Sequence, residues 1–226
     1  MLGFLYACAS AEGPPAPQDS GAREASAPLH FRWPLTDPAA FYQTTGIDHD
    51  PVIHSPGIES ALCTNFDGRA FPWCYDEHRG SDYLMEGGFD RMDAGSEPIL
   101  AAADGVVVEI ADGNYDRCHA ANAGVECDGY EMLANYVIVE HTGGWQSKYW
   151  HMKTASVAVA VGQEVSCGDT LGRVGSSGNS SFPHLHFQVE SAAGDVIDPY
   201  AGVNTQPESW WTAQGGPEDF PGMECE

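Results

Sequence analysis

Hydrophobic positions along the chain fall in short runs rich in β-branched and aromatic residues, and almost none recur with a helical period. Gly, Asn and Asp separate these runs, as in turns between strands. The runs that predict strands are residues 99–110, 135–140, 146–151, 156–161 and 184–190. Gly143-Gly144 predicts a hairpin turn, and residues 175–181 predict a loop before the last run. We therefore predict an all-β fold, a single and mainly antiparallel β-sheet domain with a surface groove and long loops.

The two ends of the chain differ from its middle. From residue 9 to about residue 28 the sequence is mostly Ala, Ser, Pro, Gly and Glu, which cannot bury enough apolar surface to fold. A length of 226 residues suits one domain with extensions. We expect a signal-like, disordered tether at residues 1–31, the domain at 32–199, and a tail at 200–226 that packs on it. In this tail, Trp210-Trp211 predicts either a short helix or an apolar clasp.

The segment Leu5-Tyr6-Ala7-Cys8 resembles the lipobox of bacterial lipoproteins, in which the cysteine receives a lipid anchor. Only seven residues precede Cys8, and none is the Lys or Arg of a signal peptide. Either the true start lies upstream and Cys8 is lipidated, or Cys8 is an unpaired thiol in the tether. Both interpretations stay open. No stretch has the 18 or so apolar residues of a spanning helix.

The other six cysteines form an even set without a C-x-x-C pattern, which favours disulfides over metal or redox chemistry. Six reduced core cysteines are the alternative, but polar, Gly-rich surroundings favour disulfides. Two pairs would close short loops, and the third follows by elimination and would pin the tail to the domain. The expected pairs are Cys63–Cys74, Cys118–Cys127 and Cys167–Cys225. They predict an exported protein, either a periplasmic or outer-membrane lipoprotein or a secreted one.

Charge narrows the range of partners. The chain has 9 Lys and Arg against 33 Asp and Glu, for a formal net charge of -24. This excess argues against nucleic acid or an anionic membrane surface as the partner. We expect a monomer.

Histidines carry the candidate chemistry. His184 and His186 lie two residues apart in a predicted strand, so both side chains point to the same face. Upstream, His78 and Asp82 lie four residues apart around Gly80, and in extended chain they too share a side. Imidazole and carboxylate ligands are typical of zinc sites.

These motifs, in this order along residues 78–190, resemble the lysostaphin/LytM-type zinc endopeptidases. The matching stretches are residues 78–82, 95–108, 135–141, 149–151, 161–175 and 183–187. The resemblance implies that His78, Asp82 and His186 bind Zn²⁺, while His151 and His184 flank the catalytic water. Three protein ligands leave one zinc position open for water, and a neutral histidine can take its proton.

A second choice of the first two ligands, which we call the second register, is also possible. Residues Glu86 to Asp90 repeat the spacing with Glu in place of His, which would make Glu86, Asp90 and His186 the ligands. We favour His78 and Asp82, because a second carboxylate would reduce the Lewis acidity of the zinc.

Other polar residues receive simpler interpretations. We assign Asn135 and Tyr149 to substrate binding by the resemblance, although Asn135 could equally be a turn residue. We expect His30, His119 and His141 to be solvated or to support the site. The oxygen-rich residues 48–51 and 112–116 lack EF-hand spacing and are interpreted as acidic turns rather than calcium sites.

Two functions of different classes follow. The favoured one is a zinc endopeptidase that hydrolyses the stem or bridge peptides of bacterial peptidoglycan. The alternative is a non-catalytic LytM-like module that binds cell wall or regulates a partner hydrolase. A third hypothesis is that the same chemistry acts on protein substrates, and the sequence contains no feature that tests it.

Overall fold

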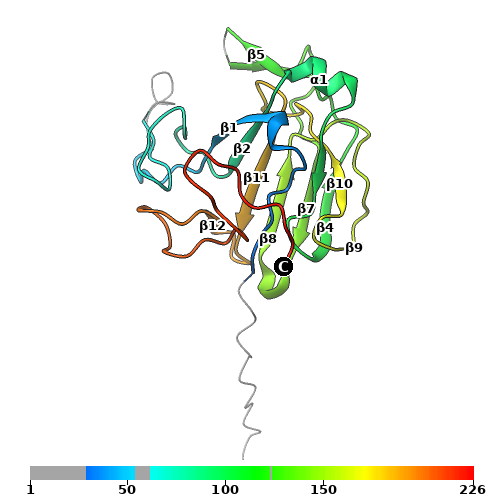
Figure 1. Ribbon diagram of the computed structural model, residues 1–226. Helices are drawn as coiled ribbons and strands as arrows, with labels where there is room; N and C mark the ends of the chain where they lie inside the picture. The colour runs from blue at the N-terminus through cyan, green and yellow to red at the C-terminus, as the bar shows by residue number, and fades with distance from the viewer. Residues whose placement is uncertain (1–28, 54–61, 123) are drawn as a thin grey trace, which may run out of the picture.

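The computed structural model of the protein describes residues 29–53, 62–122 and 124–226. Strands in these ranges form one main sheet, in which every pairing is antiparallel (Figure 1). Its order is β1 (Phe41–Thr45), β2 (Ser81–Met85), β11 (His184–Glu190), β8 (Gln146–Trp150), β7 (Tyr136–Glu140), β4 (Gly105–Ala111) and β9 (Glu164–Val165), with β12 (Val196–Ile197) paired to β11. The predicted fold class is confirmed.

Smaller elements surround this sheet. β3 (Pro98–Leu100) pairs with β10 (Thr170–Arg173), and β5 (His119–Ala121) pairs with β6 (Gly124–Glu126). Short 3-10 helices span Pro38–Ala40 and Thr142–Gly144, the latter at the predicted hairpin turn between β7 and β8. The α-helix α1 (Gly88–Ala94) was not predicted. With seven residues it is too short to show a repeating apolar face in the sequence.

The predicted strands agree with the structure unequally. Three of them match β7, β8 and β11 to within one residue at either end. The run at residues 99–110 is divided between β3 and β4 by the buried Ala101, Ala102 and Ala103. The strand predicted at residues 156–161 is wrong: Val157 and Val159 pack against the core, but the segment forms no ladder with a neighbouring strand.

The core lies on one face of the main sheet, because strand side chains alternate. In β11 the residues Leu185, Phe187 and Val189 belong to the core, and β2 contributes Tyr83. The intervening positions of β11, His184 and His186, face the other way. One strand therefore supplies both the core and the candidate site.

Segments from both ends of the chain cover the core face (Figure 1). Phe31 forms a parallel bridge with Trp211, and the ring of Trp33 stacks on Phe220 with centroids 4.5 Å apart. Trp211 is buried and also packs against Phe187. The tail is thus an apolar clasp rather than a helix at this point, and it completes the core instead of lying on a finished domain.

Three disulfides join the expected cysteines, which confirms the predicted pairs: Cys63–Cys74, Cys118–Cys127 and Cys167–Cys225. The last bond connects the turn before β10 to the end of the tail. Cys8, its lipobox-like segment and most of the proposed tether lie outside the described residues.

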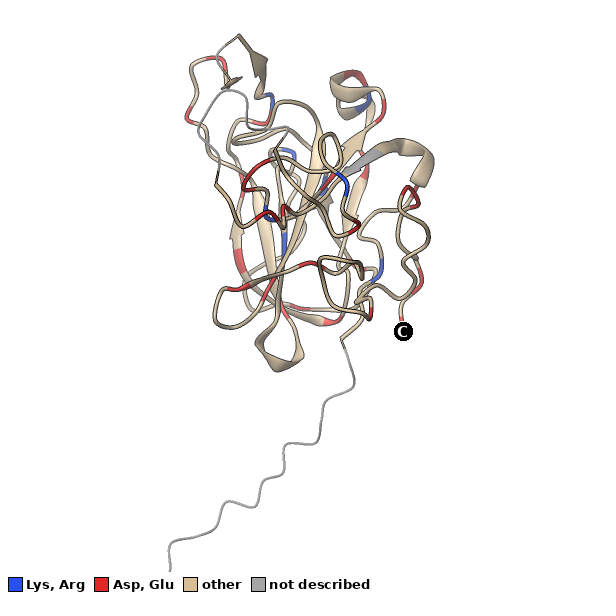
Figure 2. Ribbon diagram, turned by 90° about the vertical axis from the view of Figure 1, so that its left-hand side faces the viewer, with Lys and Arg blue, Asp and Glu red and all other residues tan. Residues whose placement is uncertain are grey.

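Acidic residues are spread over many loops and strand ends instead of forming one patch (Figure 2). In the described ranges, no helix is long and apolar enough to cross a membrane.

Candidate metal centre

Three potential metal ligands converge where β2 and β11 lie side by side. His186 Nδ1 lies 2.8 Å from Asp82 Oδ1, and His78 Nε2 lies 3.2 Å from each of these atoms. Ligands held 2.0–2.1 Å from a tetrahedral zinc ion are about 3.3 Å apart, so the spacing fits such an ion. Among the described residues, this is the single group of three or more His, Cys, Asp or Glu with ligand atoms this close together.

Sheet register creates this convergence. The antiparallel pairing of β11 with β2 sets His186 directly opposite Asp82. Both side chains leave the sheet on the face away from the core. His78 joins them from the segment that leads into β2, where its Nδ1 donates to the Gly46 carbonyl at 2.8 Å.

Gly80 is required at this junction. A Cβ atom there would lie 2.5 Å from His186 Nε2 and 2.7 Å from the Phe187 carbonyl oxygen. Neither atom can move away easily, because the His186 ring is held in the site and the Phe187 carbonyl is part of the backbone of β11. The glycine between His78 and Asp82 thus gives the His186 ring its space.

Hydrogen bonds fix the tautomers of the histidines. A carbonyl oxygen can only accept, so His78 Nδ1 carries the proton and its Nε2 offers a lone pair to the site. On the other side, His186 Nε2 donates to Gln188 Oε1 at 3.2 Å, which leaves Nδ1 free to face Asp82. Gln188 in turn donates to Glu190, which forms an ion pair with Lys148 at 2.7 Å. These three residues orient His186 from behind.

His151 and His184 lie beside the ligand group. Their ring centroids are 4.6 Å apart, and His184 Nε2 is 3.6 Å from Asp82 Oδ1. His151 Nδ1 donates to the Ser177 carbonyl, and His184 Nδ1 donates to the Phe182 carbonyl, each at 2.7 Å. In both rings Nε2 therefore keeps its lone pair and can accept a proton.

Burial and charge set the protonation of the site. Desolvation lowers the pKa of His151 to about 3, and the neighbouring His184 and His186 add to this shift. Desolvation also lowers the pKa of His184. Burial alone would raise the pKa of Asp82, but His78, His184 and His186 hold it well below its usual value. At neutral pH the site thus combines an ionised carboxylate with two neutral histidines.

The charge of Asp82 acts on His78 in the opposite sense. Desolvation alone would lower the pKa of His78, but the nearby carboxylate outweighs it, so the pKa is raised.

Aromatic side chains wall an open cleft of about 440 Å³ over these residues. Tyr75 stacks on His78 with centroids 4.1 Å apart, and its hydroxyl donates to Asp82 Oδ2 at 3.4 Å. Trp150 stacks on His186 at 5.3 Å. The sequence did not predict a role for Tyr75, Trp150 or Gln188 in the site. Gln188 had a usable signal, since it lies two residues beyond His186 in the same strand and must share its face.

The substrate-binding assignment of Asn135 and Tyr149 needs correction, because both side chains are fully buried. The Asn135 amide bonds to the backbone of Asn114 and Met152. The Tyr149 hydroxyl accepts from the Ala102 amide within the core. Neither borders the cleft.

Backbone conformation explains why the side chains of Tyr149 and His151 point to different faces of the sheet. Two residues apart in a regular strand, they would share a face. β8 ends at Trp150, however, and His151 has a φ of 63°. This left-handed conformation turns its ring towards His184, while Tyr149 stays in the core.

The second ligand register does not form a comparable group. Gly87 and Gly88 have φ angles of 76° and 51°, which end β2 and begin α1. Glu86 and Asp90 therefore do not share a strand. In the described part of the chain, neither belongs to a group that could hold a metal ion.

Other polar residues mostly serve the fold. His141 is buried, and its Nδ1 donates to the Asp104 carbonyl at 2.7 Å, so it is a core residue rather than a solvated one. Asp48 accepts from three backbone amides, and Asp112 caps turns in the same way. This use of their oxygens agrees with acidic turns at both positions.

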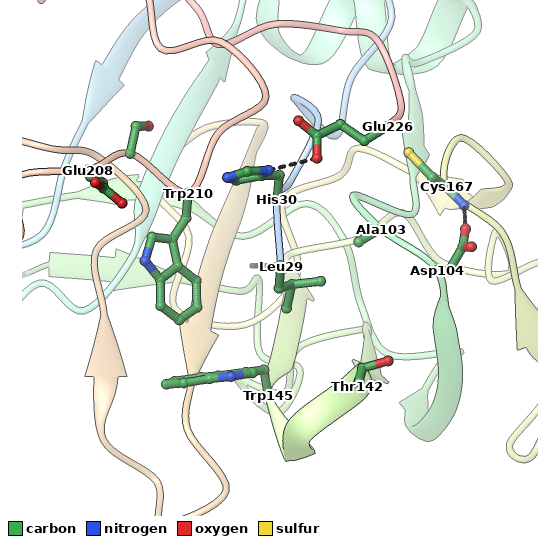
Figure 3. A pocket seen from close by; sticks show the side chains of 11 residues that line it. Leu29, His30, Ala103, Asp104, Thr142, Trp145, Cys167, Glu208, Trp210 and Glu226 are labelled. Carbon is green, nitrogen blue, oxygen red and sulfur yellow. Dashed lines mark hydrogen bonds and ion pairs between the residues drawn. The ribbon is translucent and has the colours of Figure 1, made fainter. Parts of the chain in front are cut away.

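A cavity of about 670 Å³ lies elsewhere, between the tail and the β7–β8 hairpin (Figure 3). In this view Trp145 and Trp210 lie on the same side of Leu29, and His30 contacts Glu226. None of the residues predicted for the site lines it.

Comparison with known proteins identifies a peptidase family whose sequence model covers these residues. The sequence model of peptidase family M23 matches residues 78–199. This range includes the whole histidine cluster, by which we mean His78, Asp82, His151, His184 and His186. Peptidoglycan DD-endopeptidase ShyC of Vibrio cholerae is 31% identical over 111 residues, 49% of this chain and 19% of the relative. Glycyl-glycine endopeptidase ALE-1 of Staphylococcus capitis is 32% identical over 111 residues, 49% of this chain and 24% of the relative. The match thus spans a quarter or less of either relative.

A solved structure shows the same fold. The structure of the SpoIIQ-SpoIIIAH pore forming complex contains a chain with a TM-score of 0.50 at 17% identity. The similarity covers 76% of this chain and 90% of that one.

Proposed function

Because the chain belongs to peptidase family M23, we propose that it is a zinc-dependent endopeptidase that hydrolyses peptide bonds in bacterial cell-wall peptidoglycan. Relatives named as peptidoglycan and glycyl-glycine endopeptidases support this choice of substrate. The observation that carries the proposal is the convergence of His78, Asp82 and His186, with the lone pairs of both histidines aimed at one point.

We assign Zn²⁺ to His78, Asp82 and His186. Two imidazole nitrogens and one carboxylate oxygen are ligands that zinc accepts, and three protein ligands are typical of catalytic rather than structural zinc. Hydrogen bonds hold both rings in the required tautomer, so binding would need little rearrangement. A zinc ion held there supplies Lewis acidity, which makes water a nucleophile near neutral pH.

We assign proton transfer to His151 and His184. Both are neutral at working pH and present Nε2 towards the ligand group, so either can take a proton from the attacking water. The protonated ring can then return the proton to the leaving amine as the peptide bond breaks. A protonated ring also stabilises the negative charge that develops on the carbonyl oxygen.

The location and organisation of the protein follow from this function. We propose an exported monomer, since three disulfides suit an oxidising compartment and the substrate lies outside the cytoplasm. The proposal retains residues 32–199 as the peptidase domain, 200–226 as its packed tail, and 1–31 as a tether with a lipidation candidate at Cys8.

The first test measures bound zinc in the wild type, His78→Ala and Glu86→Ala. We expect near-stoichiometric zinc in the wild type and in Glu86→Ala, and its loss in His78→Ala. Release of soluble fragments from purified cell wall is then followed for the wild type and His151→Ala. Removal of a general acid or base should slow release by about 10²- to 10⁴-fold.

Two results would contradict the proposal. Zinc retained in His78→Ala but lost in Glu86→Ala would move the ligands to the second register. Zinc-loaded protein that binds cell wall without releasing fragments would instead support the non-catalytic module.

A further inference from the structure

Arg79 stands apart from the other cations of this acidic protein. In the described part of the chain, it is the single Lys or Arg whose side chain has no hydrogen bond or ion pair within the protein. Its side chain is exposed. The others all have protein partners: Arg32, Arg69, Arg91, Arg117, Lys148, Lys153 and Arg173.

Arg79 lies next to a candidate metal ligand and at the edge of the cleft. It follows His78 directly, and consecutive Cα atoms are about 3.8 Å apart. It lines the 440 Å³ cleft over the histidine cluster. It also lines a second cleft of about 320 Å³, which shares residues 76–79 with the first. Arg79 therefore borders both clefts next to the candidate ligand His78.

The acidic residues around Arg79 make it a favourable position for an anionic group of a bound peptide. Asp76, Glu77 and Glu190 line the same cleft, and Lys148 already neutralises Glu190. The Glu77 carboxylate would repel an anionic group that enters the cleft near it. Arg79 offers such a group one favourable place.

A guanidinium binds carboxylates through two parallel N–H donors, which provide both affinity and a fixed orientation. We propose that Arg79 binds a carboxylate of the substrate peptide, so that the enzyme prefers peptides with a free carboxylate close to the scissile bond. The inference rests on the proposed function and names a substrate feature of the same site. A polyanion is the wrong partner, because its binding requires several cations and Arg79 is isolated.

A matched pair of peptides tests this inference. Both carry the same scissile bond, but one has a carboxylate and the other a carboxamide beside it. For wild-type, zinc-loaded protein we expect kcat/KM to favour the carboxylate peptide by about ten- to a hundredfold, the range for a charge-assisted hydrogen bond. Arg79→Gln should abolish this preference by raising KM for the carboxylate peptide while kcat and zinc content stay unchanged.

Two further variants sharpen the result. Arg79→Lys keeps the charge but loses the two-donor geometry, so it should retain part of the preference. Arg117→Gln removes another exposed guanidinium, which lines neither cleft and pairs with Asp93, so it should behave as the wild type.

The inference is overturned if Arg79→Gln affects both peptides equally, or if it lowers kcat alone. Binding of the same two peptides, measured by calorimetry, keeps this test separate from that of the function. If zinc-loaded protein cleaves neither peptide, the proposed activity fails. A carboxylate preference in binding that disappears in Arg79→Gln would then still support the role of Arg79, and equal binding would overturn it.

Discussion

Gln188 shows how one side chain outside the ligand group controls a ligand. Its amide N–H donates to Glu190, so its oxygen must face His186. That oxygen accepts the Nε2 proton and leaves Nδ1 as the metal-facing atom. The ion pair of Glu190 with Lys148 fixes the far end of this chain of contacts. A neutral amide thus links the metal centre to a charged pair.

Removal of this contact should weaken zinc binding. We expect Gln188→Leu to lower zinc affinity by about 10- to 100-fold, because His186 can then rotate or change tautomer. Competition with a chromogenic chelator measures the effect. Gln146→Leu, at the opposite end of β8 from the partner of His186, is the matched control and should keep wild-type affinity. Equal affinities in both variants would show that Gln188 does not set the tautomer.

His141 makes stability depend on pH in a predictable direction. Burial lowers its pKa, so the folded protein keeps the ring neutral where the unfolded chain would already bind a proton. The unfolded state therefore binds more protons below its ordinary pKa of about 6.5. Stability should fall as the pH drops from this value towards the folded-state pKa.

The contribution of His141 can be isolated by substitution. In His141→Asn, the free energy of unfolding of the zinc-free protein should decrease less between pH 7.5 and pH 5.5 than in the wild type. Urea denaturation at both pH values measures this difference. The variant should also be less stable at pH 7.5, because the contacts with Asp104 and Ser147 are lost. An unchanged pH dependence would mean that the buried ring does not titrate in this window.

At the scale of elements, β11 separates two roles by the alternation of its side chains. His184, His186 and Gln188 serve the site, and Leu185, Phe187 and Val189 serve the core. Substitutions on the two faces should therefore have different consequences.

Phe187→Ala tests the core face. A fully buried aromatic side chain is lost there, so we expect the free energy of unfolding of the zinc-free protein to fall by about 3–5 kcal/mol. Val106→Ala in β4 is the control, because Val106 is 39% exposed and should cost well under 1 kcal/mol. A similar loss in both variants would argue that β11 is not central to the core.

For the whole molecule, the Cys167–Cys225 bond joins residues 58 positions apart and holds the tail whose Trp211 completes the core. We expect the double variant Cys167→Ser/Cys225→Ser to lose about 2–4 kcal/mol of stability, because the unfolded chain gains freedom. Zinc content should stay unchanged, since the histidine cluster lies in other segments. Urea denaturation and metal analysis measure the two effects. Loss of zinc in the folded variant would instead couple the tail to the metal centre.

Local patterns in the sequence determined much of this protein. Alternation in residues 184–190 predicts that His184 and His186 share a face, and the structure has that strand at the same bounds. Cysteine spacing predicts Cys63–Cys74 and Cys118–Cys127, elimination predicts Cys167–Cys225, and the structure has all three disulfides. The strand and the two short-loop disulfides depend on neighbours in the chain, so backbone geometry and short loops are enough to decide them.

Tertiary structure decided the rest. His186 meets Asp82 across 104 residues through the register of two strands, a contact that no local pattern contains. Tyr149 points into the core as part of β8, and the left-handed backbone at His151 turns the His151 ring to the site instead. The isolation of Arg79 depends on where every carboxylate lies after folding. Each of these outcomes is set by distances between segments far apart in the chain, and only the packed molecule determines such distances.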